Sequence, residues 1–282
     1  MSLNSINTNN AAYVALQSLN STLSSLQGVQ KKISTGYRVA DAVDDGAAFA
    51  VAQRVRSDVG ALTSANQQLG GAKGLLGVTT SALTGISNTL ATARAALVKL
   101  ADTNVVGAER AQYKSQYTSL LASVKNNIAD AAYNGKTLIG DVSGSAGVYG
   151  GVALIRNEVG ATYGVAAFSG TAFFTAVNIS GVALTTAAAA AAITATGVFL
   201  NQSSKITDAL ATYGAATNYV DSQETFNNNK IDSLNSGLGA LIDADLTKES
   251  ANLQALQVRQ QLGTQALSIA NQSPQSLLSL FK

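Results

Sequence analysis

The sequence predicts a mainly α-helical chain, with long antiparallel, coiled-coil-like helices from both chain ends and a small β-rich insertion in the middle. Three observations support this fold class. Proline, which breaks helix interiors, occurs only at Pro274. Apolar residues recur at heptad spacing in several long segments. Between residues 141 and 197, charged residues become rare and glycine becomes frequent, which indicates a boundary on each side of the insertion.

The N-terminal segment carries the first heptad seam. Its positions follow 4-3 spacing and are mostly leucine. They are Ala12, Leu16, Leu19, Leu23, Leu26, Gln30 and Ile33. The glutamine in this seam either fixes the helix register or lies at the edge of a loose contact, and both interpretations stay open. Gly36 then offers a connection to the next helix.

The long helix is predicted from about residue 46 to 101, which is roughly 80 Å at ~1.5 Å per residue. Leucine recurs every seventh residue, at Leu62, Leu69, Leu76, Leu83, Leu90 and Leu97. A mostly small residue follows each leucine three positions later, at Ala65, Ala72, Thr79, Ile86, Ala93 and Leu100. The register extends back through Ala48, Val51 and Val55. Asp44 or Asp45 is expected to cap the N-terminus of this helix.

Two further helices are expected to pack on this leucine seam within the same chain. The helix at residues 108–131 has an apolar face made of Tyr113, Tyr117, Leu120, Val124 and Ile128. The helix at residues 203–241 has one made of Ile206, Leu210, Tyr213, Val220, Ile231, Leu234, Leu238 and Leu241. A short turn at residues 102–107 makes the long helix and the second helix antiparallel neighbours.

The insertion shows shorter apolar periods broken by glycine. Residues 148–155, 163–168 and 173–179 are predicted to be strands, and an alanine-rich helix is predicted near residues 186–195.

The C-terminal segment repeats the heptad pattern. Its seam is Leu253, Leu256, Gln260, Gly263, Leu267, Ala270, Pro274, Leu277 and Phe281. Further apolar residues lie off both terminal seams, at Val14, Val29, Val258, Leu262, Ile269, Leu278 and Leu280. A helix that is apolar beyond one stripe is usually buried on several sides. We therefore expect the two chain ends to pair with each other and then with neighbouring copies.

These elements predict three domains. Residues 1–42 and 247–282 form an inner domain of paired terminal helices. Residues 43–140 and 198–246 form a long-helix bundle, and residues 141–197 form the small β-rich outer insertion.

Composition excludes most kinds of chemistry. The chain has no histidine and no cysteine, so the usual zinc, thiol and Ser-His sites are not available, and no catalytic residue, metal or cofactor is predicted. The net charge is +2, and the cationic residues are scattered along the chain without a basic run, which argues against nucleic-acid binding. No apolar run reaches the ~20 residues that span a bilayer. The N-terminus lacks the blocks of a secretory signal peptide, which alone would predict a cytoplasmic protein.

Several motifs at both chain ends resemble bacterial flagellin. The N-terminal ones are residues 5–9, Leu19-Asn20, residues 33–39 and the Asp44-Asp45-Gly46-Ala47-Ala48 turn into the long helix. Asn134-Gly135-Lys136 resembles the segment that leaves the family's second helix, and residues 270–282 resemble its ending. The resemblance covers about residues 1–140 and 200–282.

The resemblance implies a structural subunit that polymerises into the flagellar filament for swimming motility. The terminal helices would form the inner layer, the bundle a second layer, and the insertion the outside. The protein would be extracellular and exported unfolded by the flagellar type III apparatus without a cleaved signal peptide. Its partners would be many copies of itself, other flagellins, an export chaperone, and cap and hook-junction proteins. No membrane insertion is implied.

Two alternatives and one modification remain open at this point. A hook–filament junction protein resembles flagellin at both ends, and an adhesin of flagellin type would bind glycans through the aromatic residues of the insertion. Many flagellins carry O-glycans, and the candidate acceptors here are Thr162, Ser169, Thr171, Thr175 and Ser180.

Overall fold

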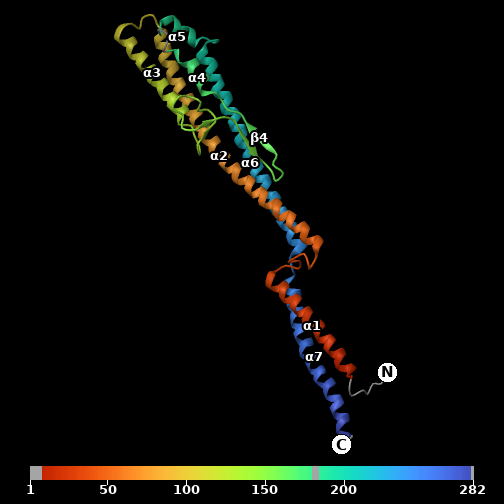
Figure 1. The fold of residues 1–282 in the computed structure, drawn as a ribbon. Helices are drawn as coiled ribbons and strands as arrows, with labels where there is room; N and C mark the ends of the chain where they lie inside the picture. Colours follow the sequence, from red (N-terminus) through yellow and green to blue (C-terminus); the bar gives the residue numbers. More distant parts are fainter. Residues whose placement is uncertain (1–7, 180–183, 281–282) are drawn as a thin grey trace. The chain divides into compact units, whose positions relative to one another are not determined.

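The computed structural model describes residues 8–179 and 184–280, and in the last helix the side chains as far as residue 272. The chain divides into two compact units. The terminal unit contains residues 1–57 and 232–282, and the bundle unit contains residues 58–231. The predicted mainly helical fold is confirmed, with long helices from both chain ends and a small insertion that contains short strands (Figure 1).

The terminal unit is built on two long helices that lie side by side, α1 (Asn10–Thr35) and α7 (Leu246–Leu280) (Figure 1). The side-chain oxygen of Asn9 accepts a hydrogen bond from the amide of Ala12 and so caps α1. The side-chain nitrogen Nδ2 of Asn9 donates to the carbonyl of Ala270 at 2.7 Å, which ties the start of α1 to α7. Gly263 removes a side chain where Leu19 approaches α7, since a Cβ there would lie 3.2 Å from the leucine Cδ1.

A short junction connects these helices to the next ones. Gly36 ends α1 in the left-handed conformation (φ 74°), which glycine adopts without steric cost. Tyr37 and Asp243 form an antiparallel bridge, and the amide of Arg38 donates to the carbonyl of Ile242 at 2.7 Å. A small buried core surrounds this bridge and consists of Val39, Ala48, Ala52 and Ile242.

The bundle unit contains most of α2 (Gly46–Ala101) and α6 (Val198–Ile242), and all of α3 (Gly107–Ala129). The six heptad leucines of α2 from Leu62 to Leu97 and the residues three positions after each of them are all buried. Core residues of α3 and α6, such as Tyr117, Val124 and Tyr213, belong to the same cluster as the leucines from Leu69 onward. The leucine seam is therefore filled by helices of the same chain.

One detail of the predicted helix faces is wrong, and another is incomplete. Val51 is exposed, whereas Ala52 is fully buried, so the heptad register of α2 does not continue unchanged through its first turns. Ala52 packs there in the junction core rather than against the bundle. On α3, Leu120 packs against the core as predicted but is only partly buried, and the predicted face omitted Leu121, which is buried.

The described residues of the insertion, with the two residues of β1 just before it, form two small sheets and two short helices. Strand β1 (Lys136–Thr137) pairs in parallel with β2 (Val148–Tyr149), and β3 (Val152–Ile155) pairs antiparallel with β4 (Thr162–Val165). The predicted strand over residues 148–155 is thus broken at Gly150-Gly151. The alanine-rich helix is α5 (Thr186–Ile193).

The strand predicted at residues 173–179 is wrong, because this segment lies largely in helix α4 (Gly170–Val177). Ser169 caps the helix by accepting a hydrogen bond from the amide of Ala172. Phe173 and Val177 are buried together, and their spacing of four residues is that of one helix face. A run of apolar residues this short does not distinguish a strand from a helix by periodicity alone.

A buried asparagine joins the β3–β4 hairpin to two long helices. The side-chain nitrogen of Asn227 on α6 donates to the side-chain oxygen of Asn66 on α2 at 2.8 Å and to the carbonyl of Arg156 at 3.0 Å. The side-chain oxygen of Asn227 accepts a hydrogen bond from the side chain of Gln223. Lys230 pairs with Glu158 in the hairpin turn. These bonds hold the insertion against the bundle, and its core residues Leu154 and Val165 join the bundle core.

Candidate assembly surface

The seam between α1 and α7 is only partly shielded from solvent. On α7, the positions Leu253, Leu256, Gln260, Gly263, Leu267 and Ala270 are all half-buried, and their neighbours between them are exposed. On α1, Leu19, Leu23 and Ile33 are half-buried, Leu26 is buried, and Leu16 is 43% exposed. Gln30 is exposed and so lies at the edge of the contact. Two helices alone cannot enclose their shared seam from every side.

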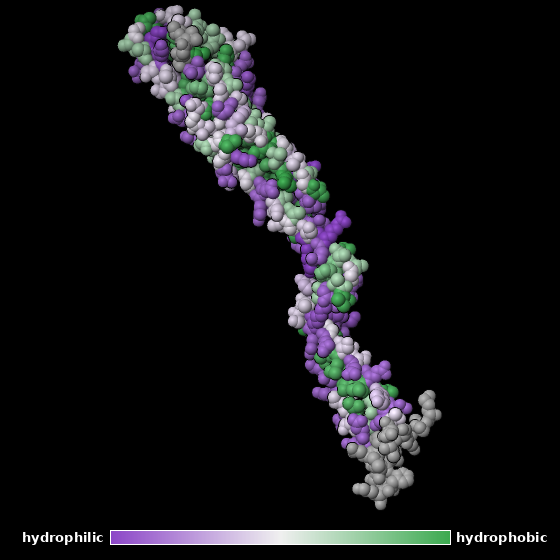
Figure 2. Space-filling view, in the orientation of Figure 1, coloured by the Kyte–Doolittle hydropathy of each residue, from purple (hydrophilic) through white to green (hydrophobic). Residues whose placement is uncertain are grey.

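The terminal hairpin also carries apolar residues away from the seam. Val14 is 66% exposed, and Leu262 and Ile269 are each 64% exposed. Tyr13 and Val258 are exposed as well. Figure 2 shows hydrophobic surface exposed on this unit. Exposed apolar residues that gather on one element mark a surface that binds another protein.

Charge is almost absent from the same helices. No charged residue occurs between Asn9 and Gln30, or between Gln260 and Phe281. A surface position without charge costs less free energy to bury, because burying an unpaired charge costs far more than burying an amide or a hydroxyl. The hairpin therefore has the composition of an interface rather than of a permanently solvated surface.

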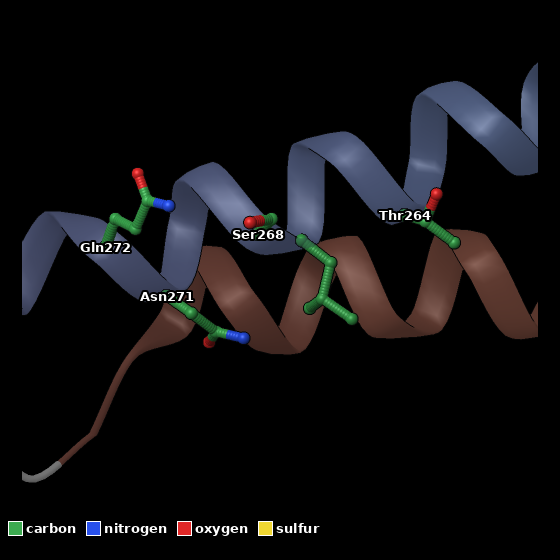
Figure 3. Close-up of a pocket in the computed structure, with 5 residues that line it drawn as sticks. Thr264, Ser268, Asn271 and Gln272 are labelled. Atoms are coloured by element: carbon green, nitrogen blue, oxygen red, sulfur yellow. The ribbon is translucent and has the colours of Figure 1, made fainter.

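Open grooves accompany this surface. One lies between α1 and α7 and is lined by Val14, Gln17, Ser18, Ser21, Thr22, Arg259, Leu262, Gly263 and Ala266. A second lies nearer the C-terminal end of α7, where Thr264, Ser268, Asn271 and Gln272 project from the helix that runs beside α1 (Figure 3). Both grooves are lined mainly by apolar and neutral polar groups. The predicted seam residues Leu277 and Phe281 lie outside the side chains that the structure describes.

The junction residues are held by a charged clamp that sequence reasoning missed. The Lys31 ammonium at the end of α1 lies 2.7 Å from Asp41 and 2.9 Å from Asp44. Asp45, not Asp44, caps α2, because its Oδ1 accepts from the amides of Ala47 and Ala48. Asp44 instead accepts from the amide of Ala40. The feature of the sequence that could have indicated this clamp is the spacing of Asp41, which lies three residues before Asp44.

The clamp shifts the pKa values of the three side chains that form it. The hydrogen bonds from the Lys31 ammonium lower the pKa of both Asp41 and Asp44. The same hydrogen bonds, first to Asp41 and then to Asp44, raise the pKa of Lys31. The clamp therefore stabilises the junction fully between the ordinary aspartate pKa of 3.8 and the ordinary lysine pKa of 10.5, and this stabilisation is lost as the pH falls through the lowered aspartate values. It is also lost as the pH rises through the raised pKa of Lys31.

We expect the Lys31→Met substitution to return the pKa of both aspartates toward 3.8. Carbon-13 NMR titration of the carboxyl groups measures this change. Because the clamp is exposed, high salt should reduce the difference between wild type and variant. Lys99→Met, on the exposed surface of α2, is the control and should leave both values unchanged. Equal pKa values in wild type and Lys31→Met would contradict the clamp.

The predicted bundle seam residues lie apart from this surface. Leu62, Leu69, Leu76, Leu83, Leu90, Leu97 and Ile206 are buried, and Leu210 is partly buried. Leu234 is half-buried and belongs to the terminal unit. Apart from Leu234, these residues build the bundle and leave the terminal hairpin as the candidate site.

The predicted glycan acceptors have different surroundings. Ser169 Oγ donates to Asp141 at 2.7 Å, and Thr171 Oγ1 donates to the Asp141 carbonyl at 2.6 Å. Their hydroxyls are thus already engaged in holding the start of α4. Thr162 and Thr175 are exposed, and Ser180 lies outside the described residues.

Two other kinds of site are absent from the described part of the chain. No cluster of acidic residues there is suited to hold a metal ion. None of the described helices combines the length and the hydropathy that crossing a bilayer requires.

Comparison with known proteins gives this surface a biological context. The model of the bacterial flagellin N-terminal helical region matches residues 6–143, and that of the C-terminal helical region matches residues 198–281. The chain is 36% identical to flagellin FljM of Caulobacter vibrioides, over all of both chains. It is 34% identical to a flagellin of Brucella melitensis over 99% of each chain, and 31% identical to flagellin C of Rhizobium meliloti over 99% of this chain.

These matches cover both helical ends, which supply the seam, the junction and the exposed face of the terminal hairpin. None of the observations favours the hook–filament junction protein or the glycan-binding adhesin. The family is one of structural proteins that polymerise from many copies, outside the cell. The chain therefore belongs to the bacterial flagellin family and is a structural subunit of the flagellar filament.

Proposed function

We propose that the terminal hairpin is the part of this subunit that carries polymerisation. Residues 1–42 and 247–282 would pack against the same segments of neighbouring copies as an inner layer. Residues 43–140 and 198–246 would form the surrounding layer, and residues 141–197 would face outward. The observation that carries this proposal is the hairpin surface itself, which carries exposed apolar residues outside its seam and is nearly uncharged.

The proposal includes ordering of the hairpin during assembly. Its seam is mostly half-buried, and Leu26 is its one buried residue among the described side chains, so an isolated hairpin gains little to offset the entropy of ordering two long helices. Neighbouring copies would supply the missing burial. The bundle unit has a closed core of its own and would stay folded in the monomer.

Hydrogen exchange on monomer and polymer tests this ordering. Amides of residues 16–33 in α1 are expected to exchange fast in the monomer and slowly in the filament. Amides of residues 83–97 in α2 serve as the internal control and should be protected in both states, because that segment lies in the buried bundle core. Slow exchange of residues 16–33 in the monomer would contradict coupled ordering.

We propose that the chain leaves the cell unfolded through the flagellar type III apparatus, without a cleaved signal peptide. The export chaperone and the cap and hook-junction proteins would be its partners on this route, and other flagellins could share the filament. The absence of cysteine supports this route, because an unfolded chain in transit then forms no wrong disulfide. Mass spectrometry of the N-terminal peptide from sheared filaments tests it, and loss of a leader segment would contradict it.

For O-glycosylation, we propose Thr162 and Thr175 ahead of Ser169 and Thr171. The first two are exposed, and the hydroxyls of the other two are bonded to Asp141. Intact mass of filament protein, compared with the sequence mass of 28.6 kDa, shows whether sugar is present. Peptide mapping then distinguishes the two pairs of sites.

A further inference from the structure

The loop between α1 and α2 presents an unusually exposed apolar side chain. We refer to residues 39–45 as the Val43 loop. Val43 is 93% exposed, although it lies between residues that are firmly held. Asp41 Oδ1 accepts from the amides of Val43 and Asp44, and Asp44 Oδ2 accepts from the amides of Ala40 and Asp41. Lys31 fastens both carboxylates to α1. A rigid loop that projects one valine loses little entropy when that valine is buried.

We propose that the Val43 loop of one subunit docks into the α1–α7 groove of a neighbouring copy of this chain. The groove is the one lined by Val14, Ser18, Ser21, Arg259, Leu262 and Ala266. Val14 and Leu262 offer it an apolar wall, and the serines leave room for an incoming side chain. The inference rests on the proposed assembly role of the hairpin and names one contact within it.

Charge favours this pairing. The Val43 loop carries Asp41, Asp44 and Asp45 and no cation of its own, and Lys31 is the cation that pairs with Asp41 and Asp44, so the loop with Lys31 keeps a net negative charge. Arg259 on the groove has no ion-pair partner among the described residues. Opposite charges beside an apolar contact set its orientation and exclude wrong partners.

The loop of a subunit cannot fill the groove of that same subunit. Lys31 holds the loop at the C-terminal end of α1, and Ser18 in the groove lies about 20 Å away along the helix at ~1.5 Å per residue. The loop and the groove are therefore different patches, offset along one rod. A contact between two different patches is heterologous and repeats from copy to copy without closing, as a filament requires.

Disulfide cross-linking tests the contact, and no disulfide from a native cysteine can interfere, because the chain has no cysteine. Filaments of the double variant Val43→Cys/Ser18→Cys are oxidised with diamide and analysed without reductant. The expected result is a ladder of linked dimers, trimers and longer species, since each subunit would donate one loop and one groove. The matched control is Val51→Cys/Ser18→Cys, because Val51 is also exposed but lies on α2 outside the loop. Filaments of the first variant without a ladder would overturn the proposal.

If the double variant does not polymerise, the two single variants are copolymerised with excess wild type. Oxidation should then give a dimer that joins position 43 to position 18, identified by mass spectrometry, and its absence would overturn the proposal. In addition, Val43→Ser should raise the critical concentration for polymerisation roughly tenfold, whereas Val51→Ser should change it less than about twofold. Failure of this contact leaves the wider assembly role of the hairpin intact, because that role is tested by substitutions in the seam.

Discussion

The Leu256→Asp variant is expected to lose polymerisation while its bundle unit stays folded. Leu256 is half-buried in the middle of the α1–α7 seam, and in the polymer its remaining surface would be covered. A carboxylate there would enter a seam whose facing stretch of α1 carries no charge, and the one cation within a turn of it on α7, Arg259, is exposed outside the seam. The critical concentration should rise more than about a hundredfold, because each tenfold change corresponds to only about 1.4 kcal/mol. Sedimentation of polymer at increasing protein concentration measures this value.

The matched control for this variant is Ala251→Asp, an exposed position on the same helix close to Lys248 and Glu249. It adds the same charge outside the seam and should polymerise nearly as wild type does. Leu267→Asp, one further seam position, should behave as Leu256→Asp does. Normal filaments from both seam variants would remove the hairpin from its proposed role.

The Leu83→Ala substitution is expected to lower the free energy of unfolding of the bundle unit by about 3 kcal/mol. Leu83 is fully buried at the centre of the α2 seam, in one cluster with residues of α3 and α6. Leucine-to-alanine changes at such positions lose both the transfer free energy and the contacts around the new cavity. Urea unfolding of the monomeric full chain, followed by circular dichroism, gives the difference.

The control for the core is Val98→Ala, which trims a half-exposed side chain on the same helix. It should change stability by less than about 0.5 kcal/mol, as surface substitutions usually do. The comparison also tests whether the seam is filled within one subunit. If Leu83→Ala destabilised only the polymer and not the monomer, the leucine seam would belong to contacts between copies.

Periodicity predicted the long helices well because their cores repeat over many turns. Each heptad leucine from Leu62 to Leu97 repeats the same local information, so single irregular positions do not hide the pattern. The insertion has no such repetition. Its strands are two to four residues long, and α4 has only eight residues. A segment that short takes its conformation from its neighbours, and this is why residues 173–179 were predicted as a strand.

The polar contacts were the least predictable from sequence. Asp44 and Asp45 are adjacent and chemically identical, yet one holds the Lys31 clamp and the other caps α2. Asn227 lies on the helix predicted at residues 203–241 with no sign in its local pattern that it is buried. Its partners, Asn66 and the Arg156 carbonyl, come from distant parts of the chain.

The sequence by itself determined the helix lengths, the two terminal seams, the leucine seam and the family, because apolar periodicity and terminal motifs are local and repeated. Only the tertiary structure decided which aspartate caps α2, which asparagine anchors the insertion, and how much of the terminal hairpin remains exposed. A hydrogen bond needs two particular groups within about 3 Å. Such a distance between residues far apart in sequence exists only after the helices have packed.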